Sequence, residues 1–204
     1  GYVVVYATQT SRDNPNACWN WFRAADQQRE QGEPAILAAM VLDVARRFDC
    51  DLDRVHVAGL SAGAAMAVNL AHLYPDVFRG VGVHSGLPFG CAHDVASAMA
   101  AMRSGGHPGG DCGAGATTPR VPTIVFHGDR DATVSVRNAD RIVGNAGPDA
   151  PGHAALQESV TTARAADRFG FTVTRTRSLS GRTTGERWIV HGAGHGWFGG
   201  SPGG

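Results

Sequence analysis

The sequence predicts an α/β fold in which a mostly parallel sheet carries helices on both faces. Strand-like apolar runs alternate with helical runs along most of the 204 residues, and such alternation is typical of parallel sheets covered by helices. In addition, the segment Gly59-Leu60-Ser61-Ala62-Gly63 joins a short apolar run to a helical run of small residues. That strand-turn-helix setting is where a Gly-X-Ser-X-Gly turn presents its serine at the edge of a sheet.

The expected elements follow from apolar periodicity and from turn residues. Strands are predicted at residues 2–6, 54–58, 80–84, 121–127, 172–179 and 186–190. Helices are predicted at residues 34–48, 62–74, 95–102, 136–143 and 154–169, with a glycine-rich loop before Pro119.

Two elements have more specific expectations. Pro34 is expected at the first position of its helix. The core-facing stripe of that helix is predicted to consist of Ala35, Ile36, Leu37, Met40, Val41 and Val44. The alternation from Thr174 to Arg177 has period two, which predicts that this strand lies at an edge of the sheet.

Ser61 is the candidate nucleophile, because it lies at the tip of the turn between strand and helix. The flanking glycines let the two elements approach closely. Ala62 follows at the start of the helix, where its N–H can bind a developing oxyanion. The similar segment at residues 199–203 has no strand before it and no helix after it, and its Pro202 lacks the required N–H.

Two aspartates compete for the role of the acid that orients a base. Asp129 and Asp131 both follow the strand-like run at residues 121–127, at the sheet edge that also carries the turn with Ser61. An acid located after the serine in the chain fits this arrangement. Either carboxylate can instead cap the next helix or pair with Arg130. Spacing alone leaves the choice open.

His195 is the expected base. It lies in a glycine-rich loop beyond the last strand-like run, where an imidazole can reach over the sheet edge. His191 is the alternative, although it is close enough to the strand to pack beside it. The remaining histidines are interpreted as core, helix or loop residues: His56, His72, His84, His93, His107, His127 and His153. No spacing typical of a zinc site occurs, so we expect no catalytic metal.

Composition and charge exclude several classes of protein. The chain has 18 basic and 18 acidic residues without long runs of either sign, which argues against binding to nucleic acid or to an anionic membrane surface. No apolar stretch approaches the ~20 residues of a membrane span, and no signal peptide is recognised. A single domain over residues 1–204 is expected. The pairing of Cys18, Cys50, Cys91 and Cys112 stays open, although a bridge between the last two would close a glycine-rich stretch.

Taken together, the motifs resemble the poly(3-hydroxybutyrate) depolymerase family of esterases. This branch of the α/β-hydrolases also includes feruloyl and acetylxylan esterases. The similar stretches are residues 14–22, 58–67, 74–78, 83–87, 126–134 and 194–200. The resemblance implies that Ser61, His195 and Asp131 form a catalytic triad. It also implies a secreted serine esterase that acts on poly(3-hydroxybutyrate) or related hydroxyalkanoate esters without a cofactor.

The aromatic cluster Trp19-Asn20-Trp21-Phe22 has two interpretations. Trp19 and Trp21 can form a wall beside the bound ester, to which Trp197 adds, or they can fill the core under a long loop. Relative to the family pattern, one strand with its oxyanion segment and a closing helix are not found. We therefore expect a partial copy of the domain, and the loss of one oxyanion donor typically costs about 10² to 10³ in rate.

The sequence also has three alternative functional interpretations. A carbohydrate esterase that releases ferulate or acetate uses the same triad chemistry with a different pocket. A hydrolase-fold binding or remnant domain keeps the triad without a complete oxyanion hole and is catalytically incomplete. A nucleotide-binding protein is disfavoured, because no Gly-X-Gly-X-X-Gly segment follows the first strand.

Overall fold

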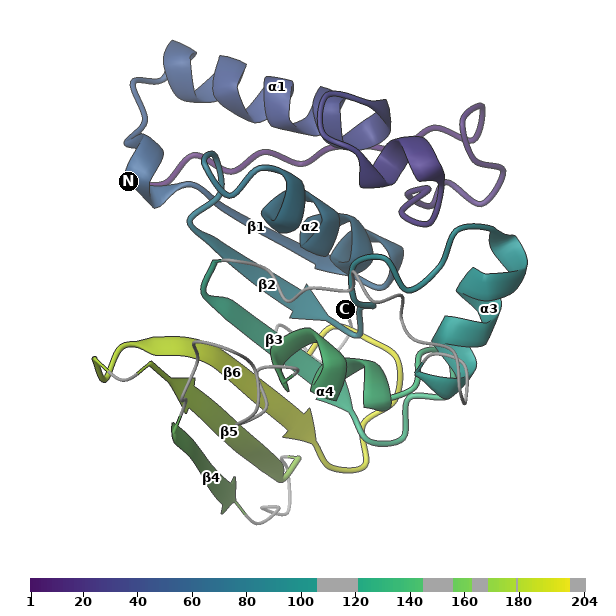
Figure 1. The fold of residues 1–204 in the computed structure, drawn as a ribbon, viewed down its shortest axis with the longest axis vertical. Helices are drawn as coiled ribbons and strands as arrows, with labels where there is room; N and C mark the ends of the chain where they lie inside the picture. Colours follow the sequence, from purple (N-terminus) through teal and green to yellow (C-terminus); the bar gives the residue numbers. More distant parts are fainter. Residues whose placement is uncertain (106–120, 145–155, 163–168, 179, 199–204) are drawn as a thin grey trace.

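The computed structural model describes residues 1–105, 121–144, 156–162, 169–178 and 180–198, and it contains a six-stranded sheet (Figure 1). The strands are β1 (His56–Leu60), β2 (Gly80–His84), β3 (Thr123–Gly128), β4 (Leu156–Thr162), β5 (Phe171–Arg177) and β6 (Thr183–Val190). They lie in the order β1-β2-β3-β6-β5-β4. The pairs β1–β2, β2–β3 and β3–β6 are parallel. Strand β5 pairs antiparallel with both β6 and β4. The predicted α/β fold with a mostly parallel sheet is therefore confirmed.

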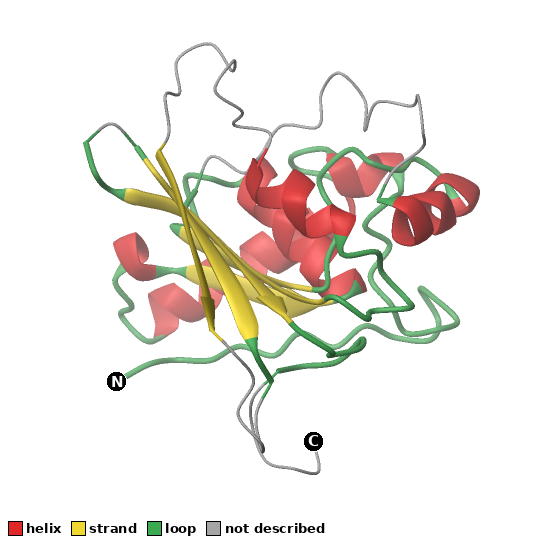
Figure 2. Cartoon of the chain, turned by 90° about the horizontal axis from the view of Figure 1, so that it is seen from below, coloured by secondary structure: helices red, strands yellow, loops and turns green. Residues whose placement is uncertain are grey.

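Four α-helices accompany the sheet in the described part of the chain: α1 (Gly32–Arg47), α2 (Ala62–Leu73), α3 (Val95–Ser104) and α4 (Arg137–Gly144). Helix α2 packs on β1 and β2, and α4 packs on β3 and β6. Both lie against the same face of the sheet, while α1 packs on α2 and α3 on α4 (Figure 1). Figure 2 shows the strands fanned against one another, as expected for a twisted sheet.

The core between α2 and the sheet depends on small side chains. Four of the eight buried residues of α2 are alanine, so the helix axis can come close to the strands. Valines of β2 and β3 fill the space opposite, and the resulting cluster consists of Ala64, Ala67, Val68, Ala71, Val81, Val83, Val121, Val125, Ala139 and Ile142. This close packing holds the N-terminus of α2, and with it residue 61, at the carboxyl end of the parallel strands.

The long loop before α1 is held by buried polar groups. Glu33 accepts hydrogen bonds from the backbone N–H of Asn20 at 2.8 Å and from its side-chain amide at 2.6 Å. The amide of Asn69 on α2 donates to the carbonyl oxygens of Trp21 and Asp26, both at 2.8 Å. These bonds fix the loop that carries the tryptophans against the helix that follows Ser61.

The strand predicted at residues 2–6 is wrong. These residues pair with no strand among those described, and Tyr2 and Tyr6 are 88% and 89% exposed (Figure 2). An alternating apolar run becomes a strand only where a neighbouring strand takes up its backbone hydrogen bonds. In the described chain, β1 is the nearest end of the sheet and pairs only with β2.

The helix predicted at residues 154–169 is wrong over the part that the structure describes. Residues 156–162 form β4, which pairs antiparallel with β5. Ser159 and Thr174 share a hydrogen bond at 2.9 Å, and so do Thr161 and Thr172. Hydroxyl and β-branched side chains favour such cross-strand pairs, and this context overrides the weak helical periodicity. Because β4 takes the outer position, the prediction that β5 lies at a sheet edge is also wrong.

Helix α1 begins two residues earlier than predicted. Gly32 is its first residue, so Pro34 is the third, still within the first turn, where a backbone N–H has no intrahelical acceptor. Its buried residues are Pro34, Ala38 and Ala45, whereas Ile36 is 62% exposed. Leu37 and Val41 of the predicted stripe do pack on the core, whereas Ile36 and Met40 are exposed. The prediction of the stripe is therefore right only in part, because the buried face is chosen by the contact of α1 with α2. Strands β1 and β6 and helix α3 lie within about two or three residues of their predicted bounds.

Candidate active site

Ser61 lies in a strained turn between β1 and α2. Its φ of 56° with ψ of −120° is a conformation that non-glycine residues rarely adopt. A Cβ atom on Gly59 would lie 2.2 Å from the carbonyl carbon of Gly63, so only glycine permits this approach of strand and helix. The backbone N–H of Ser61 donates to the carbonyl of His84 on β2 at 2.9 Å. The predicted elbow geometry is present at this position.

Ala62 is the first residue of α2. The N–H groups of a first helical turn have no acceptor within the helix, and the positive end of the helix dipole points in the same direction. The turn therefore offers a backbone donor next to the Ser61 side chain.

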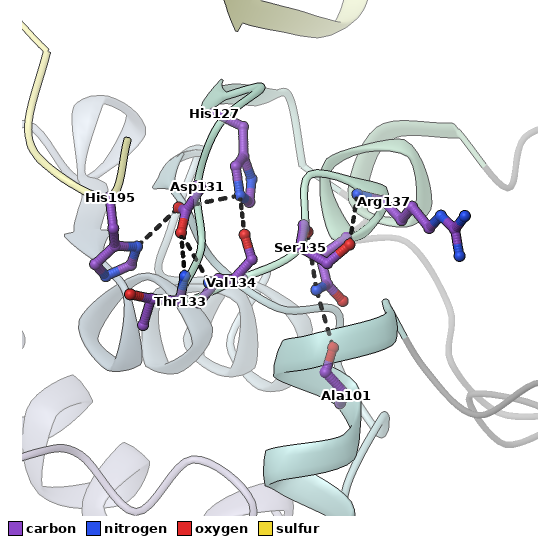
Figure 3. A network of polar contacts seen from close by, with 9 residues as sticks. Ala101, His127, Asp131, Thr133, Val134, Ser135, Arg137 and His195 are labelled. Carbon is purple, nitrogen blue, oxygen red and sulfur yellow. Dashed lines mark hydrogen bonds and ion pairs between the residues drawn. The ribbon is translucent and has the colours of Figure 1, made fainter. Parts of the chain in front are cut away.

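Asp131 lies in the loop after β3 and makes four close polar contacts (Figure 3). Its Oδ1 accepts from the backbone N–H of Thr133 at 2.9 Å and of Val134 at 2.8 Å. Its Oδ2 lies 2.8 Å from Nδ1 of His195 and 3.4 Å from Nε2 of His127. A carboxylate only accepts hydrogen bonds, so the Nδ1–H group of His195 donates to Asp131. In the neutral imidazole the other ring nitrogen, Nε2, then carries no proton and can accept one.

The Asp131 carboxyl is fully buried, while His195 is 22% exposed. Burial by itself raises the pKa of Asp131, but the Val134 N–H and the His195 imidazole, together with weaker donors, outweigh burial and bring the pKa below its usual 3.8. The carboxylate is therefore ionised at neutral pH and can hold the imidazole.

Asp129 and His191, the alternatives that the sequence left open, pair with each other. Oδ2 of Asp129 lies 3.0 Å from Nδ1 of His191, and Oδ1 accepts from the N–H of Gly192 at 2.7 Å. Nε2 of His191 lies 2.9 Å from Oγ1 of Thr172 on β5. With both ring nitrogens engaged, His191 has no nitrogen left to serve Ser61.

His84 connects the turn at Ser61 with the loop that carries His195. Its imidazole stacks on Trp197 at 4.8 Å between ring centroids and lies 4.3 Å from the Phe198 ring. Burial lowers the pKa of His84 to about 4, and neighbouring His127 and His195 add to this effect. Sequence reasoning placed His84 only as a core or neighbouring residue. Its position at the carboxyl end of a parallel strand was the available signal.

Ser85 is a residue that sequence reasoning did not select. It is fully buried, its φ is 48°, and its hydroxyl contributes to the lowered pKa of Asp131. The sequence could have pointed to Ser85 in the same way as to His84, because Ser85 directly follows a predicted parallel strand.

The three predicted substrate-contacting tryptophans occupy different environments. Trp21 is 6% exposed within a core cluster with α1 and α2 residues, so its position fits the packing interpretation. Trp19 is half-buried, and its Cδ1 lies 3.7 Å from where a Cβ atom on Gly63 would be. Trp197 is 56% exposed, two residues after His195. Trp19 therefore lies beside the turn that carries Ser61, and Trp197 lies beside His84.

Several expectations concern residues outside this site. Among the described residues, no three histidine, cysteine or acidic side chains gather as a metal site would require. No helix in the described ranges has the length and apolarity needed to cross a bilayer. Cys112, His107 and His153, with the glycine-rich loop and the segment 199–203, lie outside the described residues.

An α/β fold with a serine at a strained strand-to-helix turn and an Asp-His pair at the same sheet edge defines the general class of hydrolase-like proteins. The family model described as Esterase PHB depolymerase matches residues 1–147. The chain belongs to this family.

Curated relatives agree with this assignment. Poly(3-hydroxyalkanoate) depolymerase C of Paucimonas lemoignei is 36% identical over 152 residues, which cover 70% of this chain and 36% of that protein. Feruloyl esterase B of Thermothelomyces thermophilus is 33% identical over 99 residues, which cover 48% of this chain and 33% of that protein. The chain thus spans about a third of the length of these relatives.

A solved structure shares the fold. The acetyl xylan esterase from Aspergillus awamori superposes with a TM-score of 0.62 at 18% identity, covering 87% of this chain and 68% of that one. At this identity the similarity concerns the fold alone.

Proposed function

We propose that the protein is a serine esterase that hydrolyses carboxylic esters through Ser61, His195 and Asp131. The observation that carries the proposal is the 2.8 Å hydrogen bond between Asp131 and His195 at the sheet edge where the strained Ser61 turn lies. With Nδ1 bound to Asp131, the Nε2 atom of His195 is the base for the serine proton. No hydrogen bond joins Ser61 and His195 among the described residues, and such bonds often form only once substrate is bound.

In this mechanism, His195 removes the Ser61 proton as the hydroxyl oxygen attacks the ester carbonyl. The Ala62 N–H stabilises the oxyanion, and Asp131 stabilises the imidazolium. His195 then protonates the leaving alcohol. A water molecule, activated by the same imidazole, releases the acid from the acyl-enzyme. No step requires a cofactor.

The proposed substrate is poly(3-hydroxybutyrate) or a related hydroxyalkanoate ester, since the family description and the depolymerase from Paucimonas lemoignei name this chemistry. A second candidate is a feruloyl- or acetylxylan-type carbohydrate ester, because named relatives and the matching structure carry those activities in their names. Trp19 and Trp197 are proposed to contact the acyl or alcohol portion. A secreted location, polyester degradation as the biological role and a single domain over residues 1–204 stay predictions that rest on resemblance and length.

The test compares the wild-type chain with Ser61→Ala on 3-hydroxybutyrate oligomers, methyl ferulate and acetylated xylan. The proposal expects hydrolysis that Ser61→Ala abolishes, with the oligomers as the preferred substrate. A fluorophosphonate probe should label the wild-type chain at Ser61 and leave Ser61→Ala unlabelled. Absence of both labelling and turnover would favour the binding or remnant domain, and full activity of Ser61→Ala would reject the mechanism.

A further inference from the structure

His127 is a buried histidine that the proposed reaction does not use. It is the fifth residue of β3, its side chain is fully buried, and it lies beside Asp131 (Figure 3). Its Nε2 lies 2.8 Å from the carbonyl oxygen of Val134, and its Nδ1 is buried with no hydrogen-bond partner among the described atoms. A polar ring buried in this way needs a physical explanation.

The contact with Val134 fixes the tautomer of His127. A carbonyl oxygen only accepts, so Nε2 carries the proton and donates it. Burial lowers the pKa of the His127 imidazole, and the Val134 carbonyl and Asp131 oppose this only in part. The ring is therefore neutral, and His195 is the nearer partner of the Asp131 Oδ2 atom, at 2.8 Å against 3.4 Å for Nε2 of His127. The titratable groups that face His127 are Asp131, His84 and His195.

Val134 is held from both sides by this arrangement. Its N–H donates to Oδ1 of Asp131 at 2.8 Å, and its carbonyl accepts from His127 at 2.8 Å. The side chains of His127 and Asp131 thus close a ring around the turn at residues 131–134 (Figure 3). That turn determines where Oδ2 of Asp131 points.

We propose that His127 is a positioning residue for the esterase reaction: by holding the Val134 carbonyl, it keeps the carboxylate of Asp131 aimed at His195. The inference rests on the proposed triad and adds a fourth side chain to it, which acts only through Asp131. Without the Nε2 donor, the turn relaxes, the Val134 N–H moves away from Oδ1, and the carboxylate rotates out of line with the imidazole.

Two amide variants separate this role from simple core filling. In His127→Gln the amide nitrogen takes nearly the place of Nε2, so it can still donate to Val134. In His127→Asn the shorter side chain places its amide near the position of Nδ1, out of reach of that carbonyl. Both variants put an uncharged amide in the same buried site, and they differ in reach.

The expected result is that His127→Asn lowers kcat by about tenfold or more with KM within about twofold, since the lost interaction acts in the transition state. The acid-side midpoint of the pH profile of kcat/KM should move, because the imidazolium is held less well. His127→Gln should restore kcat to within about threefold and return the midpoint to its wild-type position. Equal effects of the two folded variants, or no effect of either, would overturn the proposal.

A second measurement needs neither a variant nor turnover. Nitrogen-15 NMR of the labelled wild-type chain distinguishes the two neutral tautomers of histidine, and His127 should be in the Nε2–H form. The Nδ1–H form would overturn the proposal whatever the variants do. Ser61→Ala, run alongside, reports on the proposed function separately, because it removes turnover while leaving the His127 tautomer unchanged.

Discussion

Asp129 and His191 form a carboxylate-imidazole pair, with Oδ2 3.0 Å from Nδ1, on the same two loops that carry Asp131 and His195. The first pair is about two-fifths exposed and ends in a hydrogen bond to Thr172. The second is mostly buried and leaves Nε2 of its imidazole available. Both pairs join an aspartate to an imidazole Nδ1 and differ only in their surroundings. The Asp129-His191 pair can therefore act as a control for the Asp131-His195 pair.

Asparagine substitutions at the two aspartates should therefore have unequal effects. Asp131→Asn is expected to lower kcat by about 10³ to 10⁴, because the amide no longer holds the reactive tautomer of His195. Asp129→Asn should leave kcat within about threefold of wild type, since both ring nitrogens of its partner His191 are already hydrogen-bonded. Steady-state kinetics of the two variants on one soluble ester decide the point. The reverse order would make His191 the base.

The two glycines of the Ser61 turn should also respond differently to alanine. In Gly59→Ala the new methyl group would meet the Gly63 backbone at 2.2 Å, so β1 and α2 must separate and activity should be lost. In Gly63→Ala the nearest atom is a Trp19 carbon at 3.7 Å, an ordinary contact. Thermal unfolding and fluorophosphonate labelling of both variants provide the comparison. Similar losses in both would mean that close approach at Gly59 is not what the turn requires.

Truncation of Trp21 and Trp19 should separate packing from substrate contact. Trp21→Ala removes a core side chain and is expected to lower the free energy of unfolding by about 3 to 5 kcal/mol. The Trp19 side chain is half-buried beside the turn, so Trp19→Ala should change KM more than the free energy of unfolding. Denaturant unfolding and KM for a hydroxybutyrate oligomer are the two measurements. A Trp19→Ala variant with unchanged KM would remove this side chain from the substrate site.

His84 should make the stability of the protein depend on pH. Its pKa is about 4 in the folded chain against 6.5 ordinarily, so between these values the unfolded chain binds a proton that the folded chain does not. The free energy of unfolding should therefore fall as the pH drops from 6.5 towards about 4. Above pH 6.5, His84 is neutral in both the folded and the unfolded chain and should cause no change with pH. His84→Phe keeps an aromatic ring against Trp197 and removes the titration. The difference between wild type and His84→Phe across this range isolates the effect, and parallel curves would contradict it.

The elements that could be predicted from the sequence are those whose structure is decided by short-range chemistry. Gly59 and Ser61 were identified because a tight strand-to-helix turn allows few residues. Strand β2 was predicted at its observed bounds because four apolar or small residues precede His84 and the turn residues Ser85 and Gly86 follow it. The helix predicted over residues 156–162 was wrong because the periodicity of these residues is weak. Pairing with β5, a contact made elsewhere in the chain, decided that they form a strand.

The sequence by itself determined the fold class, the family and the small set of side chains from which an active site can be built. It favoured His195 over His191 from its place in the loop beyond the last strand. Spacing alone left Asp129 and Asp131 open, because two positions in one loop share the same surroundings in sequence, and only the family resemblance favoured Asp131. Only the tertiary structure shows how the two Asp-His pairs differ in burial and hydrogen bonding, because these depend on which strand ends meet in space. There Asp131 is enclosed by the turn at Val134 and by His127, whereas Asp129 faces solvent beside His191.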